Sequence, residues 1–168
     1  MPLIYILEDD SSVRELETYA LQGNGFEVEG FEEPKSFYNA LGKKKPDLII
    51  IDVMLPGEDG ISITKKLRAS SEFKRIPVVM VTAKDSEIDA IKGLDCGADD
   101  YITKPFSVMI FISRVKAVLR RVSENDERRD YSYKTITVDD KKHKVYSNGK
   151  EIELTFKEYE ILKYLLRQ

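Results

Sequence analysis

Five short apolar runs recur along the first part of the chain, and each is followed by a segment whose apolar residues recur every three or four positions. The first, third and fourth runs are continuously apolar, which is typical of central strands covered on both faces. The second and fifth runs are shorter or more polar, which suits less central strands. The predicted strands are Leu3–Leu7, Glu27–Phe31, Leu48–Ile51, Val78–Thr82 and Tyr101–Thr103.

The helical spacing between these runs predicts helices over residues 11–23, 34–42, 60–69, 85–96 and 107–122. Ser11 and Ser12 are good capping residues, and Gly23 is placed to end the first helix. Strict alternation of strand and helix predicts an α/β fold. Its parallel sheet is doubly wound, with helices on both faces and right-handed crossovers.

The pattern changes after residue 121. Residues 122–133 are polar with few apolar anchors, and we interpret them as a linker. Short β segments follow, with Asn148-Gly149 as a hairpin turn signal before Glu151–Leu154. Thr155 and Glu158 match a capping box at the start of a final helix. Residues 134–168 are therefore expected to begin a second, β-rich domain.

Composition narrows the setting of this α/β protein. A net charge of −3 over 168 residues argues against nucleic-acid binding by bulk electrostatics. The single cysteine, Cys96, excludes an internal disulfide and favours a reducing compartment. No apolar stretch reaches membrane-spanning length. We therefore expect a soluble, cytoplasmic protein with no membrane partner.

Chemistry-bearing residues follow the predicted strands. Parallel strands end at one edge of a sheet, so the residues after neighbouring strands converge there. Here they are Glu8-Asp9-Asp10, Asp52, Thr82-Ala83 and Thr103-Lys104-Pro105.

Clustered carboxylates at neutral pH need a cation, and magnesium prefers such oxygen ligands. A carboxylate in this setting can attack phosphorus and form an acyl phosphate, while a lysine and a hydroxyl hold the phosphoryl oxygens. Each acid taken alone could be a solvated loop start, and Asp10 could simply cap the first helix. Their joint occurrence favours the phosphoryl-transfer site.

Four segments of the chain, with their order and spacing, resemble a two-component response regulator of the OmpR/PhoB class, which carries a winged-helix output domain. The matching segments are Ile6–Asp10, Asp47–Gly57, Pro77–Ala83 and Gly97–Phe106. The resemblance implies a flavodoxin-like receiver domain over residues 1–121. It also implies an incomplete, N-terminal part of a winged-helix DNA-binding domain over residues 134–168.

The resemblance implies a role for each pocket residue. Asp52 would accept the phosphoryl group. Asp9, Asp52 and the Met54 carbonyl would contact magnesium directly, and Glu8 would act through a metal-bound water. Thr82 and Lys104 would hold phosphoryl oxygens, Tyr101 would be the aromatic rotamer switch, and Lys104-Pro105 would be a cis peptide.

The resemblance also implies partners. A sensor histidine kinase would donate the phosphoryl group, and slow hydrolysis would reset the switch, with no further enzymatic activity. Homodimers would form through the fourth helix, fifth strand and fifth helix, using Asp99, Asp100, Arg114 and Arg121. Ala90 and Ile110 replace a charged pair of many relatives, and with Ile88 they predict a more apolar contact if they are exposed together.

Three functions follow from these expectations. The first is phosphorylation-activated control of transcription, with DNA bound by the full-length protein and not by this chain, which lacks a recognition helix. The alternative is a receiver-type interaction module that does not bind DNA in this form. A phosphatase-type enzyme ranks last, because no substrate-covering insertion separates the strands.

Overall fold

The computed structural model describes residues 1–83, 96–127, 130–133, 135–139 and 144–166. The chain divides into two compact units, Met1–Leu119 and Arg120–Gln168. The predicted domain boundary at residue 121 lies close to this division. No helix in the described ranges is long and apolar enough to cross a membrane.

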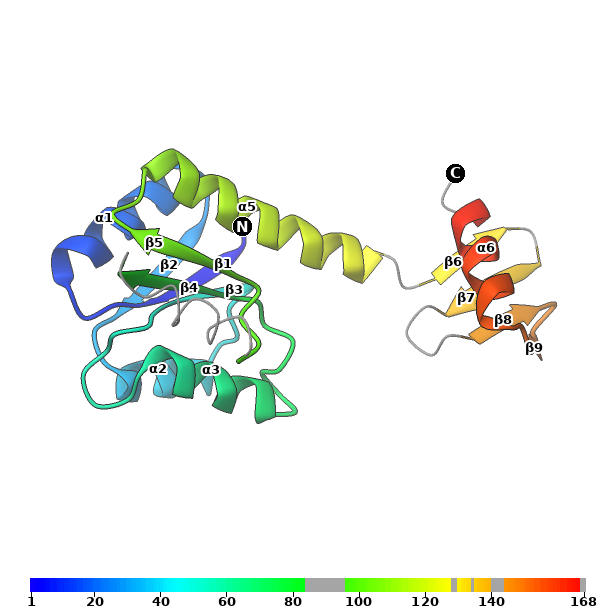
Figure 1. Ribbon diagram of the computed structural model, residues 1–168, viewed down its shortest axis with the longest axis horizontal. Helices are drawn as coiled ribbons and strands as arrows, with labels where there is room; N and C mark the ends of the chain where they lie inside the picture. The colour runs from blue at the N-terminus through cyan, green and yellow to red at the C-terminus, as the bar shows by residue number, and fades with distance from the viewer. Residues whose placement is uncertain (84–95, 128–129, 134, 140–143, 167–168) are drawn as a thin grey trace. The chain divides into compact units, whose positions relative to one another are not determined.

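The first unit is built on a five-stranded parallel sheet in the order β2-β1-β3-β4-β5. Its strands are β1 Leu3–Leu7, β2 Glu27–Phe31, β3 Leu48–Asp52, β4 Val78–Ala83 and β5 Asp100–Lys104. The helices are α1 Ser11–Gln22, α2 Pro34–Leu41, α3 Gly60–Ala69 and α5 Val108–Glu127. Helices α1 and α5 cover one face and α2 and α3 cover the other (Figure 1). The predicted flavodoxin-like doubly wound fold is confirmed; the predicted helix over 85–96 lies almost wholly outside the described residues.

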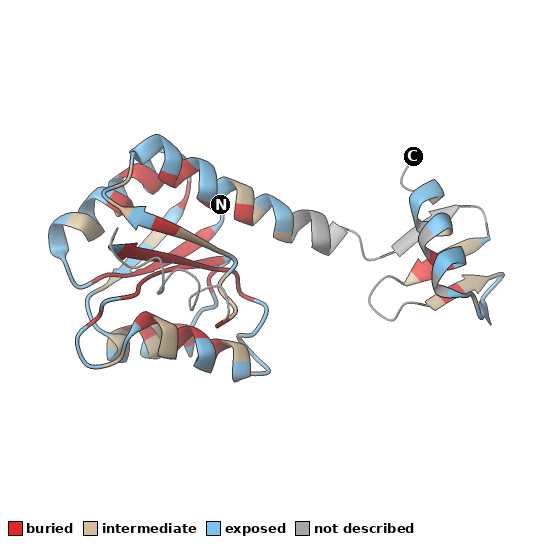
Figure 2. Cartoon of the chain, in the orientation of Figure 1, coloured by how far each residue is buried: buried red, intermediate tan, exposed pale blue. Residues whose placement is uncertain are grey.

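Two apolar clusters sandwich the sheet, and successive residues of each central strand contribute to opposite clusters. In β1, Tyr5 and Leu7 pack with Phe37 of α2, whereas Ile4 and Ile6 pack with Phe111 of α5. All five residues of β1 and of β3 are buried, as their continuous apolar pattern predicts (Figure 2). The sheet is therefore a rigid support for the side chains at the carboxyl ends of its strands.

The structure differs from the predicted linker over residues 122–133. Helix α5 continues through Glu127, and Asp130–Tyr133 forms strand β6. A helix that is already nucleated adds polar residues at little cost, so the absence of apolar anchors did not mark its end. The alternating sequence Asp-Tyr-Ser-Tyr is a strand pattern, and it pairs antiparallel with the next strand.

The second unit contains an antiparallel sheet in the order β6-β7-β8-β9 and one described helix. The further elements are β7 Ile136–Asp139, β8 Lys144–Ser147, β9 Lys150–Ile152 and α6 Phe156–Leu166. Asn148 and Gly149 both have positive φ, 50° and 76°, in the predicted hairpin turn. The capping box is confirmed, since Thr155 N donates to Glu158 Oε2 at 2.8 Å and Glu158 N donates to Thr155 Oγ1 at 3.4 Å.

Gly60 fixes how α3 packs on the end of β3. Asp59 caps this helix by accepting from Ser62 N at 2.8 Å, and Gly60 N donates to Val53 O at 3.0 Å. A Cβ atom at residue 60 would overlap the carbonyl oxygen of Asp52. The missing side chain therefore lets the first turn of α3 rest on the backbone of Asp52.

We expect Gly60→Ala to lower the free energy of unfolding of the first unit by about 1–3 kcal/mol, because the backbone of Asp52 must move. Gly42→Ala is the matched control: Gly42 has a helical φ of −69° and its added Cβ would meet nothing closer than 3.8 Å. Urea unfolding followed by circular dichroism measures both variants. Equal stabilities of the two variants would contradict the packing argument.

Candidate functional site

The carboxyl ends of four neighbouring strands bring the candidate site together. Glu8 directly follows β1, Asp52 ends β3, Thr82 is the penultimate residue of β4, and Lys104 ends β5. Because β1, β3, β4 and β5 are adjacent in that order, these residues meet at one edge of the sheet.

Lys104 lies between two buried carboxylates. Its Nζ is 2.7 Å from Glu8 Oε2 and 2.5 Å from Asp52 Oδ2. Glu8 is 1% exposed and Asp52 is 6% exposed, so both charges are largely removed from water. A buried carboxylate is tolerated when it is paired, and a single ammonium here pairs two of them.

Three carboxylates form the acidic cluster. Glu8, Asp9 and Asp52 each offer one oxygen, and these oxygens lie within 4.8 Å of one another. Asp9 is exposed, so the cluster opens to solvent on its side. Hard divalent cations bind such oxygen sets, and the donor set therefore fits magnesium.

Backbone amides orient the two buried acids. Asp52 Oδ1 accepts from Met54 N at 2.7 Å, and Glu8 Oε1 accepts from Asp10 N at 3.1 Å. Asp10 has a different role: its Oδ1 caps α1 by accepting from the backbone amides of residues 12 and 13 at 2.8 and 3.1 Å. The capping interpretation of Asp10 is thus confirmed.

Burial and mutual charge shift the titration of the pocket. Burial raises the pKa of the Glu8 carboxyl to about 7, the hydrogen bond from Lys104 opposes that rise, and the charge of Asp52 adds to it. Burial alone would lower the pKa of Lys104, but its hydrogen bonds to Asp52 and Glu8 outweigh burial and raise it. Lys104 therefore stays charged at neutral pH.

Thr82 and Tyr101 take different positions relative to the cluster. Thr82 is 1% exposed and lies one residue beyond Val81, the partner of Asp52 across the β3–β4 ladder. Tyr101 is half-buried and packs against the apolar cluster beneath α2 and α3. The Lys104–Pro105 peptide is cis, as the resemblance implied.

The predicted dimer residues lie outside the pocket, and three of the four are paired within the chain. Asp99 Oδ2 accepts from Arg68 Nη2 and from Val78 N, each at 2.8 Å. Asp100 accepts from Arg114 Nη1 at 2.9 and 3.1 Å. Arg121 is exposed.

The apolar departure from the family pattern falls partly within the described residues. Ile110 is 54% exposed at the start of α5, beside Val108 and Met109, which are 40% and 80% exposed. Ile88 and Ala90 lie outside the described residues.

Sequence reasoning missed Glu17, which is 1% exposed in α1. Within the described part of the chain, neither of its carboxylate oxygens has a hydrogen-bond partner. Burial and the charge of Glu8 raise the pKa of Glu17 to about 8, with Lys104 opposing. Helical spacing could have indicated its burial, since Ala20 and Leu21 follow three and four positions later on the same buried face.

A doubly wound sheet whose carboxyl edge gathers three acids and a lysine defines a receiver domain of a signalling protein. The family model for the response regulator receiver domain matches residues 4–116. The chain belongs to the response regulator family, and its curated relatives are regulators of the OmpR/PhoB class.

Two curated relatives and two solved structures give the extent of the likeness. The phosphate regulon transcriptional regulatory protein PhoB of Escherichia coli strain K12 is 38% identical over 97% of this chain and 71% of its own length. The sensory transduction protein RegX3 of Mycolicibacterium smegmatis is 39% identical over 99% of this chain and 74% of its own.

Among solved structures, a putative response regulator from Chloroflexus aurantiacus matches with a TM-score of 0.69 and 35% identity, covering 71% of this chain and 98% of that one. The receiver domain of the TMAO respiratory system response regulator TorR matches with a TM-score of 0.67 and 31% identity, covering 73% and 99%.

We expect Glu17→Met to raise the free energy of unfolding by about 1–3 kcal/mol near neutral pH, because it removes a buried carboxyl that has no hydrogen-bond partner among the described residues. The folded-state pKa of about 8 lies above the ordinary 4.5, so the protonated acid is favoured on folding. Stability of the parent chain should therefore fall as pH rises from the ordinary pKa of 4.5 toward the folded-state pKa of about 8, and the advantage of methionine should grow over this range and level off above it.

Thermal unfolding across this pH range measures the effect. Glu15→Met, an exposed neighbour on the same helix, is the control and should change little. A parent chain as stable as Glu17→Met at every pH would contradict the assignment of Glu17 as a destabilising acid.

Proposed function

We propose that this chain is a phosphorylation-activated switch whose phosphoacceptor is Asp52, with a sensor histidine kinase as donor. The observation that carries the proposal is the ammonium of Lys104 held between Glu8 and Asp52 in a pocket of three carboxylates. An ordinary ion pair consists of one carboxylate and one cation. Here Asp52 and Lys104 are joined by a second buried acid, Glu8, and by an exposed third acid, Asp9.

Glu8, Asp9, Asp52 and the Met54 carbonyl would hold magnesium. The bound cation would supply positive charge that offsets repulsion between the pocket and an incoming phosphoryl group. The Met54 amide orients Asp52 through Oδ1, and Lys104 holds Oδ2. The chain's own contribution is therefore an oriented nucleophile in a preformed site.

In the proposed transfer, a carboxylate oxygen of Asp52 forms a bond to phosphorus while the phosphorus–nitrogen bond of the donor's phosphohistidine breaks. The product is an acyl phosphate, and the imidazole leaves with the bonding electrons. Lys104 then pairs with a phosphoryl oxygen, and the buried hydroxyl of Thr82 bonds to another. Slow attack by water returns the aspartate.

Movement of Thr82 toward the phosphoryl group would vacate space that Tyr101 takes up, so that a charge change in the pocket alters the outer surface. Phosphorylation would thereby shift an equilibrium between two surface states. We further propose homodimerisation through the fourth helix, fifth strand and fifth helix. Control of transcription would follow in the whole protein, since PhoB is named a transcriptional regulatory protein.

Incubation with acetyl phosphate and magnesium should add one phosphoryl group to the chain, detected by intact mass. Asp52→Asn should abolish the addition, because the amide lacks the nucleophilic carboxylate. Asp100→Asn, an acid outside the pocket, serves as the control and should keep the label. Label that persists in Asp52→Asn would sink the assignment.

The proposed dimer should tolerate salt, because Ile110 presents an apolar side chain and Asp100–Arg114 is already paired within the chain. Ile110→Glu should weaken phosphorylation-dependent dimerisation roughly ten-fold, equivalent to about 1.4 kcal/mol. Sedimentation at low and high salt, with Arg121→Ala for comparison, measures this. Dissociation by salt alone, with Ile110→Glu unaffected, would exclude the apolar contact.

A further inference from the structure

The loop that carries both acid ligands is held from the side by one side chain of α1. Arg14 Nη1 donates to the carbonyl oxygen of Glu8 at 2.5 Å and to that of Asp9 at 3.3 Å. Its contact with the carboxylate of Glu32 is long, 3.9 Å from Nη2 to Oε2, and the side chain of Glu32 is 74% exposed. The guanidinium is therefore directed chiefly at the backbone of the acid pair.

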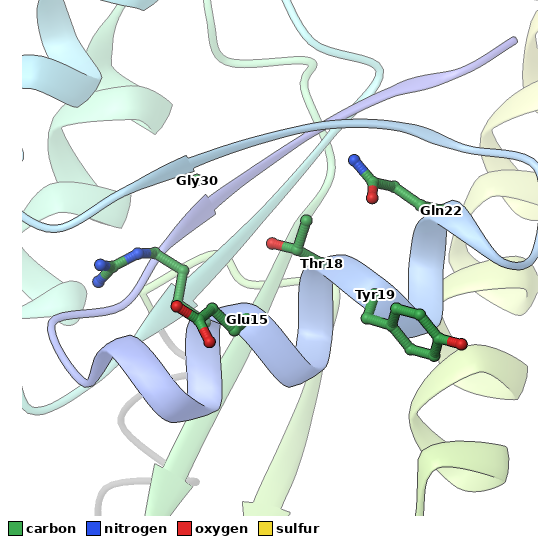
Figure 3. Close-up of a pocket in the computed structure, with 6 residues that line it drawn as sticks. Glu15, Thr18, Tyr19, Gln22 and Gly30 are labelled. Carbon is green, nitrogen blue, oxygen red and sulfur yellow. The ribbon is translucent and has the colours of Figure 1, made fainter.

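Gly30 of β2 makes room for this side chain. A Cβ atom at residue 30 would lie 3.1 Å from both Cγ and Cδ of Arg14, closer than ordinary packing allows. Glycine inside a strand often marks such a close approach. Gly30 lies on its strand facing α1 (Figure 3). The groove there has a volume of about 270 Å³ and is also lined by Glu15, Thr18 and Gln22.

The same strand supports the acid loop directly, since Glu8 N donates to Phe31 O at 3.0 Å. The backbone amide of Glu8 is thus tied to β2, and its carbonyl is tied to Arg14, whose stem lies against β2. Both sides of the peptide chain at Glu8 are restrained before either carboxylate meets a cation.

We infer that Arg14 is a positioning residue for the acid pair Glu8 and Asp9, and that the absence of a side chain at Gly30 provides the space for Arg14. The inference rests on the proposed function, because it assigns Arg14 a task at the proposed cation site. Charge-assisted hydrogen bonds to two successive carbonyls fix the direction in which Glu8 and Asp9 leave the backbone. Groups that orient ligands in this way strengthen metal binding without touching the metal.

The direction in which magnesium affinity changes when Arg14 is replaced distinguishes a positioning role from a simple electrostatic one. A positive charge close to the pocket repels a divalent cation, so removing it would tighten cation binding if charge alone mattered. Loss of positioning weakens binding instead. A purely structural role would lower stability and leave the affinity of the folded chain unchanged.

The test measures magnesium affinity directly, by calorimetric titration of the full chain. Arg14→Met keeps the apolar stem and removes the donors, and it should weaken magnesium binding roughly 10- to 100-fold. Arg14→Lys, which restores one donor group, should recover part of the loss. Glu32→Gln is the control and should bind as the parent chain does, because it removes only the long exposed contact.

Gly30→Val provides an independent arm, since it displaces the Arg14 stem and deletes no polar group. It should weaken magnesium binding in the parent chain and have no further effect in a chain carrying Arg14→Ala. If Arg14→Met fails to fold, Gly30→Ala, which shifts the stem by a few tenths of an ångström, takes its place and should weaken binding by a smaller factor.

Magnesium affinity that is equal or tighter in Arg14→Met, or additive effects of Gly30→Val and Arg14→Ala, would overturn the inference. A parent chain that binds no magnesium would overturn the proposed cation site itself, and the inference with it. A parent chain that binds magnesium but takes no phosphoryl group would sink the proposed function while leaving the positioning result to stand on affinity.

Discussion

The contact on which the receiver unit depends is the ammonium of Lys104 shared by Glu8 and Asp52. Two carboxylates at the end of a fully buried sheet would repel each other, and the lysine from β5 offsets that repulsion across three strands. The pairing requires β1, β3 and β5 to end at the same level, which parallel strands in this order provide. The fold and the electrostatics of the pocket therefore stabilise each other.

The hydrophobic pattern predicted most of this frame because buried parallel strands leave a direct signal. Continuous apolar runs such as Leu48–Ile51 have few alternatives to a buried parallel strand. Acids that follow such strands lie at the carboxyl edge of the sheet, because parallel strands end at the same edge. The acidic cluster of Glu8, Asp9 and Asp52 could be predicted for the same reason. Residues 122–133 were harder, because a polar segment can continue a helix, form an edge strand or link domains with similar local cost.

Contacts between distant residues could not be predicted. Nothing in the local sequence indicates that Arg68 donates to Asp99 or that Arg114 pairs with Asp100 inside one chain. The helical spacing of Glu17 with Ala20 and Leu21 is consistent with a buried position, but only the packing of α1 reveals that its carboxylate oxygens have no hydrogen-bond partner among the described residues. Arg14 and Gly30 likewise belong to different elements, and the close approach of the Arg14 side chain to Gly30 depends on the packing of α1 against β2.

The contact at Gly60 limits which substitutions this sequence can accept. When two side chains crowd each other, a larger residue at one position can be accommodated by a smaller one at the other. The first turn of α3 meets Asp52 through main-chain atoms, which no substitution at residue 52 or elsewhere can shorten. A larger residue at position 60 therefore cannot be compensated by a smaller side chain at residue 52, and the space that α3 needs depends on the glycine alone.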